Sequence, residues 1–207
     1  MDNQNAPVPE LKLYAYDSEY ARSKKTGSHY WTVDLILALA LLAAVGVAYL
    51  LRNVIPSDSP MYTPFIVGIL AAAVVVYLIF KGAMSYRTDA WFCSFAQRDG
   101  RLFHLEFSPR QGIGLFGTLF DAAHCSASIK AAADPEIVGE VLSYAAAGAR
   151  VPASTKYRNV TVTELHSAAL TLKGKKVIAN YFDRAGKQRK LVTADCFKGL
   201  AEDFCGR

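Results

Sequence analysis

The alternation of polar and apolar positions breaks down in two long stretches of this chain. Val33 to Leu51 is a run of 19 residues with a single charge, Asp34, at its edge, and Met61 to Phe80 is a run of 20 residues with none. Neither run has the polar face, repeating every 3.6 residues, that a helix on a water-soluble core shows. At 1.5 Å per residue each can cross a hydrocarbon layer of about 30 Å, so we expect two membrane spans.

The connection between the two runs is short. Arg52 to Pro60 contains two prolines and is long enough for a turn only, so the spans are expected to form an antiparallel hairpin. Lys and Arg gather at the outer ends of the spans, which places both termini in the cytoplasm of a multi-pass protein of the bacterial inner membrane. The basic residues flanking the hairpin on that side are Arg22, Lys24, Lys25, Lys81, Arg87, Arg98 and Arg101. We divide the chain into a cytoplasmic segment 1–32, a hairpin 33–84 and a cytoplasmic domain 85–207.

Small residues recur at helical spacing in both spans. They are Ala40, Ala44 and Ala48 in the first span and Gly68 and Ala72 in the second. Small faces let helix backbones approach closely in a membrane, so they can pack the two spans together or support a homo-oligomer. The alternative is that alanine is simply frequent in these runs.

Alternating patterns return after the second span and predict an α+β domain built on an antiparallel sheet with two helices. Asp134 and Pro135 begin a helix that ends near Gly148, and Asp195 caps a short closing helix, Cys196–Phe204. Asp99-Gly100 is expected in the turn of the first β-hairpin. The expected strands are Ala90–Gln97, Leu102–Phe107, Asn159–Leu172, Lys176–Phe182 and Gln188–Thr193.

One alternating segment lies ahead of the membrane. Leu11 to Tyr16 reads as a half-buried strand, which cannot be stable alone. Because both termini are expected on the same side, this strand either pairs with an edge of the C-terminal sheet or belongs to a disordered tail.

Positive charge is concentrated in the C-terminal domain. Residues 85–207 hold 17 Lys and Arg against 12 Asp and Glu, so the domain carries the net charge of +5 of the whole chain. The densest cluster has one acid, Asp183, among seven basic residues: Lys173, Lys175, Lys176, Arg184, Lys187, Arg189 and Lys190. Near a cytoplasmic leaflet such a cluster attracts anionic lipid headgroups, and it would equally suit an acidic protein. The alternative is that these are solvated turn residues that keep an edge strand from aggregating.

No catalytic, cofactor or metal motif is supported by the sequence. Gly112 to Gly117 matches G-x-G-x-x-G, but too little chain follows for a dinucleotide-binding domain, so a turning apolar loop is expected there. Asp34 is a candidate as an intramembrane carboxylate, although its position one turn from the boundary also lets it reach water. The four cysteines form no C-x-x-C pair and are expected as reduced, packed thiols. A metal site from distant segments stays open only as an alternative, for His104 with Glu106 and for His124 beside Cys125.

The end of the chain resembles a known domain type. The segments TVTELHSAALTL, KKVIANYF, DRAG, KQRKLV and TADCFKGLAEDF run as strand, strand, turn, strand and closing helix. Over about 45 residues this order resembles the final half of bacterial pleckstrin-homology-like domains that follow a two-span hairpin in uncharacterised membrane proteins. The resemblance implies a small sheet sandwich or barrel, capped by the last helix, that serves as a lipid or protein interaction module.

Composition agrees with a membrane-anchored module. The mean hydropathy is +0.17 although 20% of the residues are charged, which excludes a wholly soluble globule, a disordered tail protein and a disulfide-rich secreted scaffold. We expect a membrane-anchored interaction or scaffold module with no nucleic-acid partner and no cofactor. An enzyme that acts at the membrane surface is left open as a competing reading, but the sequence offers no paired carboxylates or nucleophile motif for it. The alternative is an accessory subunit of an oligomeric transport or secretion complex.

Overall fold

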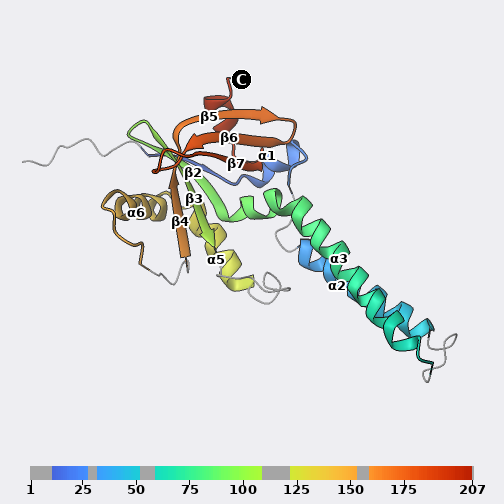
Figure 1. Ribbon diagram of the computed structural model, residues 1–207. Coiled ribbons are helices and arrows are strands. Elements are labelled where there is room, and N and C mark those ends of the chain that lie inside the picture. Colours follow the sequence, from blue (N-terminus) through green and yellow to red (C-terminus); the bar gives the residue numbers. More distant parts are fainter. Residues whose placement is uncertain (1–10, 28–31, 52–58, 109–121, 153–158, 207) are drawn as a thin grey trace, which may run out of the picture.

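The computed structural model describes residues 11–27, 32–51, 59–108, 122–152 and 159–206. The chain begins with β1 (Leu11–Ala15) and α1 (Ser18–Ser23), then leaves as a pair of long helices, α2 (Thr32–Leu51) and α3 (Tyr62–Thr88). The remaining elements form a compact body at one end of this helix pair (Figure 1). We call α2 and α3 the helical hairpin, and β1, α1 and the described residues from 89 onward the sheet domain.

A four-stranded antiparallel sheet holds the first half of the sheet domain. After a single 3-10 turn, η1 (Asp89–Phe92), the strands β2 (Cys93–Arg98) and β3 (Arg101–Ser108) form a hairpin, and β4 (Asn159–Glu164) pairs with β3. The strand order is β1-β2-β3-β4, which leaves β4 at an edge. Asp99 and Gly100 in the β2–β3 turn both have positive φ, at 51° and 72°, as a type I′ turn requires. The hairpin predicted from Asp-Gly is confirmed.

The N-terminal strand belongs to this sheet. β1 pairs with β2 in the register Leu11 to Arg98 and Ala15 to Ser94, so the predicted pairing with the C-terminal domain is confirmed. The Tyr14 hydroxyl donates a hydrogen bond of 2.6 Å to Asp203, and Lys12 lies 2.7 Å from the same carboxylate oxygen. The two ends of the chain therefore close on one another, and residues 85–207 alone would lack one strand of their sheet.

A second antiparallel sheet follows, where the sequence predicted one continuous sheet. It consists of β5 (His166–Lys173), β6 (Lys176–Phe182) and β7 (Gln188–Ala194) in that order. The strand predicted over Asn159–Leu172 is wrong in its length, because the chain leaves β4 and enters β5 at Leu165. Leu165 is buried between the sheets, and Ser167 has a φ of 50° where the register of β5 shifts. The chain therefore changes sheets at Leu165, and the irregularity at Ser167 bends the first residues of β5.

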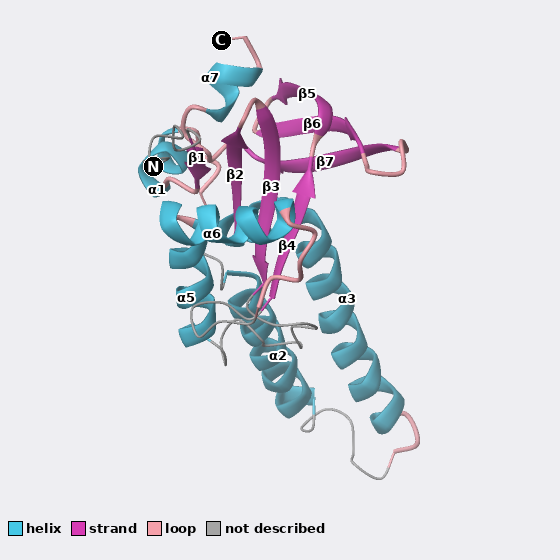
Figure 2. Ribbon diagram, turned by 90° about the vertical axis from the view of Figure 1, so that its left-hand side faces the viewer, coloured by secondary structure: helices cyan, strands magenta, loops and turns pink. Residues whose placement is uncertain are grey.

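Three layers make up the sheet domain (Figure 2). Alternate residues of β2 and β3 face opposite sides, so Ala96, Leu105 and Phe107 pack against helices. Phe95 and Leu102 pack on the other side against the second sheet and the C-terminal segment, including Phe197. The two hydrophobic clusters thus lie on the two faces of the first sheet.

Two helices, α5 (Ala122–Ala132) and α6 (Pro135–Ala146), cover the outer face of that sheet. Asp134 caps α6 and Pro135 is its first residue, as predicted. Helix α5 was not predicted from the sequence, because its buried residues are small and leave no stripe of large apolar side chains. They are Cys125, Ser128, Ala131 and Ala132.

The closing helix is shorter than predicted. It begins at Leu200, as α7 (Leu200–Phe204), after Gly199 with a φ of 83°. Asp195 does not cap it, because this residue is buried and its carboxylate accepts a hydrogen bond of 3.1 Å from the Tyr20 hydroxyl. The expected N-cap thus joins the C-terminal segment to α1.

The helical hairpin has its own small interface. Leu37 and Ala44 of α2 are buried, together with Ala73 and Tyr77 of α3. Ala44 was predicted there, but Gly68 and Ala72 are exposed, because α3 turns the face that carries Ala73 and Tyr77 toward α2. With one exception, Phe182, every exposed large apolar side chain among the described residues lies on α2, on α3 or at Met61.

By length and composition, Tyr62–Phe80 of α3 can cross a membrane, and only 11% of that stretch is buried. The apolar part of α2, Leu35–Leu51, is shorter. Among the described helices α3 alone meets the length of a full span, so the two-span hairpin stays a prediction. The connecting residues 52–58 and the Gly112–Gly117 loop lie outside the described residues, as does the side chain of Asp34.

Candidate functional site

The seven basic residues singled out from the sequence lie at opposite ends of the second sheet. Lys173, Lys175 and Lys176 lie at the β5–β6 turn, and the other four lie in the β6–β7 turn or in the first residues of β7. The strand β6, with seven residues at about 3.3 Å each, separates the two turns by about 20 Å. The sequence predicted a single cluster, and the structure divides it into two groups. The second group is Arg184, Lys187, Arg189 and Lys190.

The first group lies at the end of the sheet domain from which the helical hairpin leaves (Figure 1). The Lys175 ammonium donates a hydrogen bond of 3.1 Å to the backbone carbonyl of Lys25, just after α1. Lys176 lines a cavity that also includes Gly82 of α3. We call the exposed basic residues at this end the basic collar: Arg22, Lys24, Lys25, Lys173, Lys175 and Lys176. From the sequence, Arg22, Lys24 and Lys25 indicated only the topology of the spans. The hydrogen bond between Lys175 and Lys25 places them beside the β5–β6 turn.

The second group lies beside a groove. Asp183 accepts hydrogen bonds from the Arg189 side chain at 2.9 Å and from the turn amides of Ala185 and Lys187. These bonds, the one from Arg189 first, hold the pKa of the Asp183 carboxyl below its usual value. The Asp183 carboxylate therefore has its hydrogen-bond partners within the β6–β7 turn and at the start of β7. Arg184 and Lys187 of the same turn are exposed.

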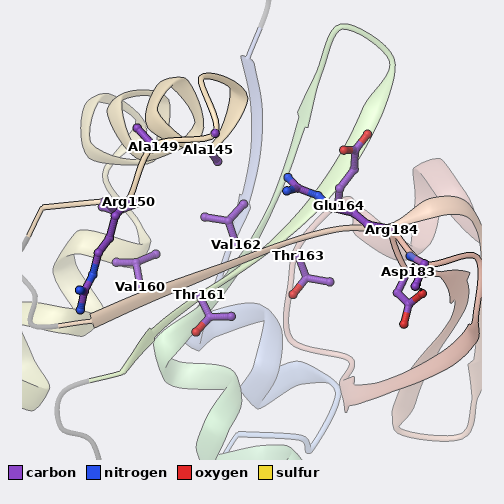
Figure 3. Close-up of a pocket in the computed structure, with 13 residues that line it drawn as sticks. Ala145, Ala149, Arg150, Val160, Thr161, Val162, Thr163, Glu164, Asp183 and Arg184 are labelled. Atoms are coloured by element: carbon purple, nitrogen blue, oxygen red, sulfur yellow. Dashed lines mark hydrogen bonds between the residues drawn. The ribbon is translucent and has the colours of Figure 1, made fainter.

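A groove of about 650 Å³ runs along the outer edge of β4 (Figure 3). One wall is the end of α6 with Ala145 and the segment after it with Arg150, and the other is the β6–β7 turn with Asp183 and Arg184. Figure 3 places Arg150 at the start of β4 and Arg184 at its end. The floor is the edge strand itself, Val160 to Glu164. Arg150 was not predicted as a site residue, because no local sequence pattern connects it with the β6–β7 turn.

The hydrogen bonds of β4 show which backbone groups face the groove. The Leu165 amide donates to the Leu102 carbonyl at 2.8 Å, so Leu165 is bonded toward β3. Bonded and non-bonded pairs alternate in an antiparallel ladder, which directs Thr161 and Thr163 to β3 as well. The alternate residues of β4, which are Val160, Val162 and Glu164, have amides and carbonyls that point away from β3.

A second cavity, of about 370 Å³, lies where the helical hairpin joins the sheet domain, and it includes Cys93, His104 and Glu106. Burial lowers the pKa of His104 to about 4 and raises the pKa of Cys93. Both groups are therefore neutral at pH 7, so this cavity holds no activated thiolate and no imidazolium. No three His, Cys, Asp or Glu side chains within the described ranges are placed to hold a metal ion.

Comparison of the chain with models of known protein families, with curated proteins and with solved structures finds no match. Two features of the molecule itself indicate a function: the basic collar beside the helical hairpin, and the groove along β4.

Proposed function

We propose that the protein is a membrane-anchored interaction module. In this proposal the helical hairpin crosses the inner membrane, the sheet domain lies at its cytoplasmic face, and the basic collar contacts anionic lipid headgroups. The observation that carries the proposal is the exposure of large apolar side chains along both helices. Leu42 and Leu50 of α2 and Ile79 of α3 are each 64% exposed or more.

Exposure of this kind distinguishes the hairpin from a buried helix pair. A core helix of a soluble protein is mostly buried, whereas 11% of Tyr62–Phe80 is buried. Soluble monomers rarely expose contiguous apolar patches larger than a few hundred Å². The 20 residues of α2 are about 30 Å long at 1.5 Å each, close to the thickness of a hydrocarbon core.

The position of the basic collar supports contact with lipid. Its six positive charges lie where the hairpin would enter the leaflet, and each basic residue near an anionic surface contributes about 1 kcal/mol. Two acids near it have partners of their own, because Asp17 caps α1 and Asp195 is buried against Tyr20. Asp89 and Glu106 share the cavity that Lys176 lines, so the other five bases would carry the lipid contact.

The arrangement of strands supports an interaction module of the pleckstrin-homology-like type. Four strands in one sheet and three in another, followed by α7, agree with the sandwich and final helix that the resemblance implies. Lipid or protein contact by surface residues would then be the function, without catalysis.

An accessory subunit of an oligomeric transport or secretion complex is the second candidate. Gly68 and Ala72 favour it, because these small residues are exposed on α3 instead of facing α2. A small exposed face permits close packing of another helix in a membrane. A strictly monomeric protein in mild detergent would contradict this candidate.

Cysteine labelling in intact cells is expected to place the hairpin loop outside and the β6–β7 turn inside. Cys93, Cys125 and Cys196 are buried, so only the partly exposed Cys205 needs replacement by serine. In that background an impermeant maleimide should label Ser57→Cys in intact cells, and Lys187→Cys only after lysis. Labelling of position 187 alone in intact cells would invert the topology.

Lysine footprinting on the full chain in nanodiscs tests the lipid contact. With anionic lipid, acetylation should slow at Lys173 and Lys175 relative to neutral discs, and the protection should disappear near 0.5 M salt, where the Debye length is about 4 Å. Lys187 and Lys190 are matched controls within the same protein, because they lie at the far end of β6. Equal protection at both ends of β6, or none at the collar, would remove lipid contact from the proposal.

A further inference from the structure

We propose that the groove along β4 binds an extended acidic peptide of a partner protein, which adds to the first sheet as a fifth strand. This inference rests on the proposed function, because it names the partner class of the interaction module. The peptide would lie between the end of α6 and the β6–β7 turn, at the end of the second sheet away from the basic collar.

Unused backbone groups are the first argument. The outward amides and carbonyls of Val160, Val162 and Glu164 have no hydrogen-bond partner among the described residues. An added strand satisfies such groups, and main-chain bonding of this kind is a common mode of peptide recognition. The six residues of β4 are about 20 Å long, which matches an extended peptide of about six residues.

The composition of β4 is the second argument. Edge strands are usually protected by lysine, proline, a bulge or a covering element. The sequence of β4 is NVTVTE, with no lysine or proline and with four β-branched residues in a row. Its register with β3 is regular throughout. The groove along the strand is open, so β4 has the features of an edge that is built to receive another strand.

The charges beside the groove define the chemistry of the peptide. Glu164 lies 3.5 Å from both Arg101 and His166, and Asp183 is bound by Arg189. Arg150 and Arg184 also line the groove, and no ion pair is formed by either within the described part of the chain. The charges left without a partner are therefore both positive and lie at opposite ends of β4. A peptide with an acidic residue near each end would neutralise both.

The same charges argue against a second copy of this chain as the occupant. Two β4 strands that paired antiparallel about a two-fold axis would bring the start of one strand to the end of the other. Arg150 of each copy would then lie beside Arg184 of the other. Like charges that face each other across an interface disfavour pairing, so the geometry favours a different, acidic chain.

Peptide selection on the full-length protein tests the inference. A displayed library of random eight-residue peptides is selected on the protein in nanodiscs of neutral phosphatidylcholine, where the anionic-lipid contact plays no part. Enriched peptides should carry acidic residues near both ends and alternating β-branched residues between them. Failure to enrich any peptide, or enrichment of the same peptides by the Arg150→Glu/Arg184→Glu protein, would overturn the proposal.

The affinity of an enriched, fluorophore-labelled peptide for variants of the groove separates the contribution of the charges from that of the main-chain hydrogen bonds. Arg150→Glu/Arg184→Glu should weaken binding about tenfold or more through the charges. Val162→Pro should do the same, because it removes an outward amide and leaves the ladder to β3 intact. The matched control, Lys187→Glu/Lys190→Glu, changes bases that do not line the groove and should stay within about twofold. A control that weakens binding as much as the groove variants would contradict the assignment.

Two further outcomes are distinguishable. Lys173→Gln/Lys175→Gln/Lys176→Gln should abolish the lipid-dependent footprint and leave peptide affinity unchanged, so failure of the lipid contact does not remove the groove inference. A wild-type dimer that Val162→Pro converts to a monomer would assign the groove to a second copy and overturn the acidic partner.

Discussion

Replacing Phe95 with alanine is expected to lower the free energy of unfolding by about 3–5 kcal/mol. Phe95 is completely buried at the centre of β2, with its ring 5.1 Å from that of Phe197 and 5.0 Å from that of His104. It joins the first sheet to the second sheet and to the C-terminal segment. Removal of its ring leaves a cavity that the first sheet, the second sheet and the C-terminal segment cannot all fill by moving together.

Urea unfolding of the full chain in detergent measures this effect. Trp91 stacks on Tyr16 at 4.0 Å, so its fluorescence reports on the joint between β1 and β2 when Trp31 is replaced by phenylalanine. Phe182→Ala is the control, because Phe182 is 45% exposed and its loss should cost less than about 1 kcal/mol. Equal losses for the two variants would contradict the assignment of Phe95 to the core.

Acidification from pH 6.5 to pH 4 is expected to remove about 3 kcal/mol of stability through His104 alone. Burial lowers the pKa of His104 from 6.5 to about 4 in the folded protein. Between these two values the unfolded chain binds a proton that the folded protein does not, so stability falls as the pH falls. Above pH 7 the side chain is neutral in both states, and its contribution no longer changes with pH.

The variant His104→Gln isolates this effect from the titration of carboxylates. Its stability should fall less than that of the wild type between pH 6.5 and pH 4, whereas the difference between the two proteins should stay constant above pH 7. Asp89, Glu106 and Lys176 line the same cavity and are unchanged in both proteins. Parallel stability curves over the whole range would mean that His104 is accessible to protons in the folded state.

Local patterns were enough for the elements whose signals act within a few residues. Asp134 and Pro135 marked the start of α6, and Asp99-Gly100 marked the turn between β2 and β3. The apolar runs marked both long helices, although α3 continues to Thr88, beyond the end of its run. Helix α5 was missed because small residues bury their surface without a hydrophobic stripe.

The candidate sites depend on contacts that no local pattern contains. The Lys175 bond to the Lys25 carbonyl gathers the basic collar from segments on either side of the hairpin. Arg150 and Arg184 belong to the same groove because α6 and the β6–β7 turn lie on either side of β4. The charge run Lys173–Lys190, read as one cluster, was split because β6 runs between its two halves.

By itself the sequence determined the two apolar helices, most strands, the cap of α6 and the tight turn between β2 and β3, because hydrophobic period, proline, glycine and capping side chains act on neighbouring residues. Only the tertiary structure decided that β1 pairs with β2, that the chain changes sheets at Leu165, and that no strand among the described residues covers the outer edge of β4. These features follow from which strands become neighbours. That choice is made by burying side chains from distant segments together, and so it cannot be read from any one segment of the chain.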